Sequence, residues 1–146
     1  MKEAQKLAEL APKIMNAFHD LGRQHGSGDR LSIRQYQALI ILKANNTLTI
    51  TQLCKKLKLA PSTGTELVNR LIALKYVRKS QTDSDQRQVT LSLTPKGIEL
   101  LQQREEALTG MFARFLAPFP PDKAADFVNA FEDIWNSIVT YHINSK

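Results

Sequence analysis

The sequence predicts a mainly helical α+β protein, a winged helix-turn-helix with long N- and C-terminal helices. Two short amphipathic helices separated by a tight turn occupy the middle of the chain. Two alternating strands follow them directly, YVRKSQ (76–81) and QVTLSL (88–93). On both sides, apolar residues recur every three or four positions, which is typical of helices that bury one face. The order of helix, turn, helix and two-stranded ribbon predicts the class.

The N-terminal segment carries one apolar stripe, made of Leu7, Leu10, Ile14, Phe18 and Leu21. The run GRQHGSGDR (22–30) predicts an exposed loop, because three glycines, a serine and charges interrupt the stripe. Ser32 and Gln35 have the spacing of a capping box, so a second helix is expected over about 33–44. Its expected apolar positions are Tyr36, Leu39, Ile40 and Leu42.

Each of the two short helices has its own start signal. Thr49 and Gln52 form a second capping box, which opens a helix of roughly ten residues. Its expected inward residues are Leu53, Cys54 and Leu57. Pro61 suits the first position of the next helix, where its missing N–H would be unpaired anyway. In that helix Leu67, Val68, Leu71 and Leu74 share one face, and the opposite face is polar.

The C-terminal part is predicted to hold two long helices. Thr94 as N-cap and Pro95 at the first position start one of them, and PFPP (118–121) ends it. Its stripe is Ile98, Leu101, Leu108, Met111, Phe112 and Phe115. The last helix, from about 121, carries Phe127, Val128, Phe131, Ile134, Trp135, Ile138 and Tyr141.

Composition is that of an ordinary soluble domain. The 146 residues are 42% hydrophobic and 23% charged, and one domain is expected. No run of about 18 apolar residues predicts a membrane span, and the start lacks the apolar core of a signal peptide. A single cysteine, Cys54, excludes an internal disulfide and fits a reducing compartment. A cytoplasmic location without membrane contact is therefore expected.

Positive charge gathers in the middle of the chain. Residues 49–90 hold eight bases and three acids, whereas residues 91–146 hold five bases and seven acids. This asymmetry favours a polyanionic partner for the central segment. A solvated surface with a chance basic excess explains the charge equally well.

A winged helix matches the shape of duplex DNA. An α-helix fits the major groove and presents polar side chains to base edges. A narrow basic ribbon can follow phosphates or place an arginine in the minor groove. DSDQRQVTLSLTPKG (83–97) is accordingly interpreted as the wing and its junction with the next helix.

These residues also resemble the MarR (multiple antibiotic resistance regulator) family of bacterial transcription regulators. The resemblance rests on Asn69-Arg70-Leu71 in the second short helix, Asp85-Gln86-Arg87 in the wing, and Leu93 to Gly97 as Leu-Thr-x-x-Gly. It implies one domain over 1–146, with a DNA-binding lobe at 32–94 and dimerisation helices at 1–23 and 95–146. It further implies a homodimeric, ligand-responsive repressor that binds a pseudo-palindromic operator.

Four positions depart from the family pattern. Glu66 stands where such helices more often carry a neutral or basic residue, and a carboxylate there would accept from a cytosine amino group. Gly64 replaces an apolar residue, at a cost of about 1 kcal/mol against alanine in a helix interior. Ala60 replaces the usual capping residue, so Ser62 or Thr63 is expected to cap. Tyr76 replaces a glycine.

Candidate DNA contacts follow from position. Arg87 is the expected minor-groove arginine, with Asp85 bracing the wing tip; a surface pair on a hairpin is the alternative. Arg70 is expected either to reach a phosphate or, as the resemblance implies, to pair with Asp85. The remaining helix candidates for bases or phosphates are Ser62, Thr63, Thr65, Glu66 and Asn69, each also explained by a solvated face. Purely electrostatic contacts are expected from Lys55, Lys56, Lys75, Arg78 and Lys79.

Other chemistry has little support in the sequence. Cys54 is expected to pack in the core, with thiol-based oxidant sensing as an alternative function. The three histidines lack metal-ligand spacing, and neither a catalytic triad nor a phosphate-binding loop is present, so no enzyme activity, metal or cofactor is expected. Glu66 also suits a second alternative, a winged helix that binds another protein.

The terminal helices predict assembly. Their stripes hold more large aromatic residues than one small domain needs, so a two-fold homodimer is expected, with a self-folded monomer as the alternative. The family resemblance suggests a small aromatic or lipophilic anion as effector. Arg30, Arg34 and Tyr36 are the residues expected to line the ligand pocket.

Overall fold

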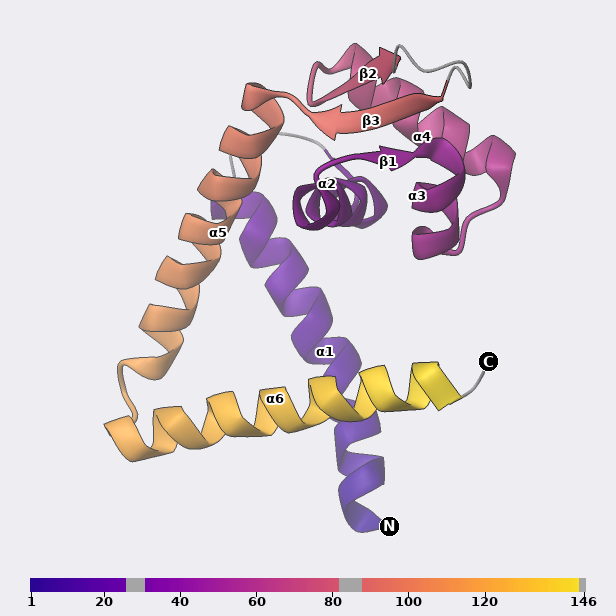
Figure 1. The fold of residues 1–146 in the computed structure, drawn as a ribbon. Helices are drawn as coiled ribbons and strands as arrows, with labels where there is room; N and C mark the ends of the chain where they lie inside the picture. Colours follow the sequence, from indigo (N-terminus) through magenta and orange to yellow (C-terminus); the bar gives the residue numbers. More distant parts are fainter. Residues whose placement is uncertain (26–30, 82–87, 145–146) are drawn as a thin grey trace. The chain divides into compact units, whose positions relative to one another are not determined.

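The computed structural model describes residues 1–25, 31–81 and 88–144 (Figure 1). The chain divides into two compact units, Met1–Ala107 and Leu108–Lys146. The helices are α1 (Lys2–His25), α2 (Ile33–Asn45), α3 (Ile50–Leu57), α4 (Pro61–Ala73), α5 (Pro95–Leu116) and α6 (Pro121–Asn144). The strands are β1 (Leu48–Thr49), β2 (Val77–Gln81) and β3 (Val89–Leu93). This order confirms the predicted mainly helical winged-helix class.

The helix starts follow the predicted capping signals. Ser32 Oγ accepts from the Gln35 backbone N–H at 3.2 Å, and the Gln35 side chain accepts from the Ser32 N–H at 2.8 Å. Thr49 and Gln52 make the same reciprocal pair at 3.1 and 2.9 Å. Both capping boxes are thus confirmed. One boundary was wrong: α1 continues to His25, so the first residues of the predicted loop 22–30 are helical.

The core of the first unit lies between α2, α3, α4, the sheet and the first turns of α5. Its largest fully buried side chains are Leu39, Leu42, Leu53, Leu71, Leu91 and Val68. Three residues that the apolar stripes assigned inward are instead exposed: Ile40 by 54%, Leu74 by 37% and Ile98 by 47%. In α2 the buried positions include Ala38 and Gln35. The helix is therefore turned slightly from the orientation that its largest apolar residues predict.

The sheet has three antiparallel strands in the order β1-β3-β2. Leu48 of β1 lies opposite Leu91 of β3, and Val77 of β2 lies opposite Leu93. These four side chains are buried, so the ribbon packs on the helices through one face, as expected for a hairpin that is marginal alone. Strand β1 was not predicted, because two residues are too few to show alternation.

Hydrogen bonds fix the junction between β3 and α5. Thr94 Oγ1 accepts from the Gly97 backbone N–H at 3.1 Å and donates to the carbonyl of Lys75. The Thr94 N–H donates to the carbonyl of Tyr76 at 3.0 Å. A Cβ at position 97 would overlap that same carbonyl oxygen, so the close approach of α5 requires glycine. The Leu-Thr-x-x-Gly pattern thus holds the start of α5 against the turn that follows α4.

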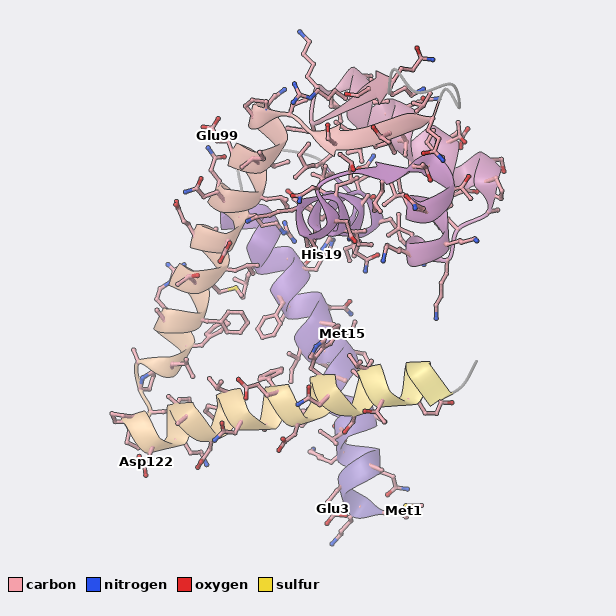
Figure 2. The ribbon with its side chains drawn as sticks, in the orientation of Figure 1. Met1, Glu3, Met15, His19, Glu99 and Asp122 are labelled. Carbon is pink, nitrogen blue, oxygen red and sulfur yellow. The ribbon has the colours of Figure 1, made fainter. Side chains whose placement is uncertain are left out.

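The second unit consists of the C-terminal half of α5 and helix α6. Phe119 and Phe127 pack edge to face across the turn, with ring centroids 5.2 Å apart. Farther along α6, Phe131 is 59% exposed and Trp135 is 63% exposed. Figure 2 shows side chains projecting along the length of this helix. Within the described residues, no helix has the length and apolar character needed to cross a membrane.

Candidate nucleic-acid interface

Helix α4 is held against the lobe by one narrow apolar side. Val68 and Leu71 are essentially inaccessible to solvent. Gly64 faces Cys54 of α3 so closely that a Cβ at this position would overlap the sulfur atom. Leu67 and Ile72 are half-buried against the same core, and the opposite face of the helix is open. All six predicted contact residues of α4 are exposed, namely Ser62, Thr63, Thr65, Glu66, Asn69 and Arg70.

The start of α4 differs from the expectation. Ala60 is the N-cap residue with extended backbone, φ −62° and ψ 148°, and no side chain caps it. Neither Ser62 nor Thr63 takes that role, so this prediction was wrong. Both residues follow Pro61 inside the first turn of α4 and are exposed. Thr65 Oγ1 donates back to the carbonyl of Pro61 at 2.8 Å.

Glu66 and Arg70 are one helical turn apart on the exposed face. Within the described part of the chain, neither side chain makes a hydrogen bond or an ion pair. Both line an open hollow of about 480 Å³ between α4 and the start of α2. Its other lining residues are Ser32, Gln35, Thr63 and Leu67. The hollow thus presents one carboxylate, one guanidinium and several hydroxyl or amide groups.

The surroundings are strongly basic. Residues 49–81 hold seven lysines and arginines and a single acid, Glu66. All of these charged side chains are exposed, including Lys55 and Lys56 on α3 and Lys75 after α4. Arg78 and Lys79 extend the basic surface onto β2, where both are exposed. The predicted wing residues Asp85 and Arg87 lie outside the described residues, as does any pairing of Arg70 with Asp85.

Two of the expected ligand-pocket residues, Arg34 and Tyr36, contact different helices. Arg34 donates through Nη1 to the carbonyl of Leu57 at 2.9 Å and so binds the last turn of α3. Tyr36 is buried, and the Arg104 guanidinium lies 3.7 Å from its ring centroid. Arg34 therefore contacts α3, whereas Tyr36 contacts α5. Arg30 lies outside the described residues.

Cys54 is buried at 5% exposure, as predicted for core packing. Among the described residues, no three histidine, cysteine, aspartate or glutamate side chains come together in a way that could hold a metal ion.

Ser32 and Gln35 are the residues whose place at this surface the sequence did not predict. Their capping spacing is visible in the sequence, but their proximity to α4 depends on how α2 packs. The contact of Arg104 with Tyr36 likewise joins residues 68 positions apart in the chain, and no local pattern indicates it.

Comparisons with known proteins agree on one family. Residues 31–88 match the model of the MarR family. The HTH-type transcriptional regulator TtmR of Methylorubrum extorquens is 30% identical over 113 residues, which cover 71% of this chain and 58% of that protein. The chain spans 58–60% of the length of the curated relatives that it matches.

Solved structures show the same fold over nearly the whole chain. A MarR family protein from Bacillus stearothermophilus superposes with a TM-score of 0.83 at 22% identity, covering 94% of this chain and 96% of that one. The PcaV transcriptional regulator from Streptomyces coelicolor, solved in complex with its natural ligand, gives a TM-score of 0.64 at 25% identity. That match covers 90% of this chain and 92% of PcaV.

Proposed function

Because the chain belongs to the MarR family through its winged-helix lobe, we propose that it is a sequence-specific, duplex-DNA-binding regulator of transcription. The observation that carries this proposal is the exposed polar face of α4, in a segment (residues 49–81) whose seven bases are all exposed. Such a face can enter the major groove while the bases neutralise phosphates on either side. Members of this family are transcription regulators rather than enzymes, and we assign no catalytic role to the chain.

DNA binding and dimerisation are assigned to different parts of the chain. Residues 32–94 form the DNA-binding lobe, and residues 1–23 and 95–146 form a homodimer. A two-fold dimer presents two copies of α4 to successive major grooves, so its operator is a pseudo-palindrome with half-sites roughly 34 Å apart. Such a regulator acts in the cytoplasm, where bacterial DNA is found.

We further propose that the protein is a ligand-responsive repressor. PcaV, which shares the fold, was solved with its natural ligand. Since the lobe is basic, its electrostatics favour an anionic effector. The family resemblance suggests that this anion is small and aromatic or lipophilic. A ligand that binds better to a dimer whose two lobes do not match the half-site spacing shifts the population toward that form and so releases DNA. Buried Cys54 makes oxidant sensing the weaker alternative, because oxidation requires access to the thiol.

The direct test is a titration of fluorescent duplex from the gene's upstream region, repeated across salt concentrations beside an unrelated duplex. We expect selective binding with a steep negative salt slope. Arg70→Ala removes an exposed cation with no partner among the described residues, so the slope becomes shallower by about 0.9, one phosphate contact. Arg87→Ala is expected to lower affinity for the upstream duplex.

Lys43→Ala is the matched control. It removes one exposed positive charge from the last turn of α2 and leaves the net charge equal to that of the Arg70 variant. Its salt slope is expected to remain that of the unmodified protein. Equal weak binding to both duplexes, unchanged in Arg70→Ala and Arg87→Ala, would contradict the proposal and indicate a protein partner for the winged helix.

A further inference from the structure

We infer that Glu66 is the specificity-determining residue of α4 and selects a cytosine in each half-site of the operator. The inference rests on the proposed DNA-binding function and adds the base and the residue that recognises it. It concerns the single acid of a basic segment, which a purely electrostatic interface would not contain.

Helix geometry places Glu66 on the line of α4 directly opposite the buried side, which is called the crest of the exposed face. Gly64, Val68 and Leu71 are the buried residues of α4. At about 100° per residue, position 66 lies roughly 170° round the helix from the middle of this buried side. The crest is the part of a recognition helix that enters the major groove most deeply. Glu66 is therefore the longest α4 side chain on the line of the helix that faces the base edges.

Its neighbours on the crest leave the carboxylate room to reach a base. Ser62, one turn earlier, and Ala73, two turns later, lie on the same line of the helix and are both short. Asn69 and Arg70 flank the crest, one on each side, in positions suited to other bases or phosphates. Within the described residues no cation pairs with Glu66, so the carboxylate is available to a ligand.

The chemistry of a carboxylate restricts the base. An ionised carboxylate only accepts hydrogen bonds, and the phosphates beside it repel it. In the major groove guanine presents two acceptors and thymine presents an acceptor and a methyl group. Adenine offers its amino group beside the N7 acceptor, which faces the same carboxylate. Cytosine presents its N4 amino group alone, so it is the base that Glu66 accepts without an opposing acceptor.

The basic surroundings explain how the interface tolerates this acid. Lys55, Lys56, Lys75, Arg78 and Lys79 attract any duplex, whatever its sequence. A carboxylate at the crest weakens binding to every sequence except the one that satisfies it. Glu66 thus contributes discrimination by lowering affinity for the wrong duplexes more than by raising affinity for the right one.

The test uses the full-length protein and its selected operator, in duplexes that carry all four base pairs at each position in turn. The unmodified protein is expected to prefer cytosine at one position of each half-site by roughly tenfold over the other bases. Glu66→Gln is nearly isosteric and exposed, so folding is unaffected. Glutamine pairs with adenine N6 and N7, so the preference at that position moves from cytosine to adenine.

Two further variants make the experiment specific. Glu66→Ala is expected to bind all four duplexes at that position within about twofold, and to bind unrelated DNA more tightly than the unmodified protein does. Asn69→Ala, one turn away, should leave the cytosine preference intact. If the unmodified protein binds selectively and both Glu66→Gln and Glu66→Ala keep its base preferences unchanged, the inference is overturned while the proposed function stands. Absence of any selective binding by the unmodified protein would overturn the proposed function as well.

Discussion

The contact between Gly64 and Cys54 shows how one residue positions the DNA-facing helix. In the sequence, Gly64 counts as a cost to α4, because glycine is a poor helix former. In the structure it is the point where α4 lies directly on the Cys54 sulfur of α3. The absence of a side chain lets the two helices meet, and the depth of that contact determines how far α4 projects.

Gly64→Ala is expected to lower the free energy of unfolding by about 1–3 kcal/mol. The added methyl group would overlap Cys54 Sγ, and the helices must separate to admit it. Alanine's better helix propensity offsets about 1 kcal/mol of that cost at most. Urea denaturation followed by circular dichroism measures the change.

Two controls separate packing from propensity. Gly110→Ala makes the same substitution inside α5, where nothing lies within 4 Å of the new Cβ, and is expected to stabilise by about 0.5–1 kcal/mol. Cys54→Ala removes the sulfur, so the double variant Cys54→Ala/Gly64→Ala should recover part of the lost stability relative to the sum of the two single changes. Strictly additive effects would show that Gly64 and Cys54 do not interact.

Among the elements, the junction of β3 with α5 carries the clearest prediction. The Thr94 hydroxyl accepts from the Gly97 N–H and donates to the Lys75 carbonyl, so one side chain connects the start of α5 to the turn after α4. Lys96 adds a bond from Nζ to the Leu74 carbonyl at 3.0 Å. Thr94→Ala is expected to cost about 1–2 kcal/mol in a urea denaturation, whereas Thr94→Ser keeps the hydroxyl and loses less than half of that. Equal losses in the two variants would assign the effect to the methyl group.

Local signals in the sequence predicted the elements well where the chemistry is local. The capping boxes at Ser32 and Thr49 and the proline at 61 determine where three helices begin, because they satisfy or remove orphan backbone groups within a few residues. Burial was less predictable. Ile40 and Ile98 fit apolar stripes but are exposed, because which face a helix buries depends on elements distant in sequence.

In the candidate site, too, features set by local sequence were predicted and features set by distant packing were not. The polar face of α4 follows from helical period and was predicted residue by residue. The hollow beside it was not, because Ser32 and Gln35 reach α4 only through the packing of α2. The accommodation of Gly64 was also missed, since nothing in the sequence pairs it with Cys54.

At the scale of the whole molecule, the charged and apolar surfaces belong to different parts of the chain. Bases dominate residues 49–81, whereas α6 exposes large aromatic and aliphatic side chains along with its charged ones. Exposed apolar residues also occur on α1, where Leu7 is 58% exposed and Met15 is 69% exposed. Figure 2 shows Met15 and His19 on successive turns of that helix. Apolar surface on this scale indicates an interface, which supports the proposed homodimer.

The chain's single tryptophan makes the dimer directly measurable. Trp135 lies on α6 and is 63% exposed in the isolated chain. If α6 packs against a second copy, its emission is blue-shifted at high protein concentration and shifts to longer wavelength on dilution below the dissociation constant. Sedimentation velocity on the same samples is expected to give the mass of two chains at the higher concentration.

Phe131→Asp should shift this equilibrium to the monomer and weaken operator binding, because a single lobe reaches only one half-site. Asp133→Ala is the matched control, since position 133 lies about 200° round α6 from Phe131 and is also exposed. It is expected to remain dimeric with an unchanged emission spectrum. A Phe131→Asp protein that still sediments as a dimer, with Trp135 emission independent of concentration, would show that another surface holds the two copies together.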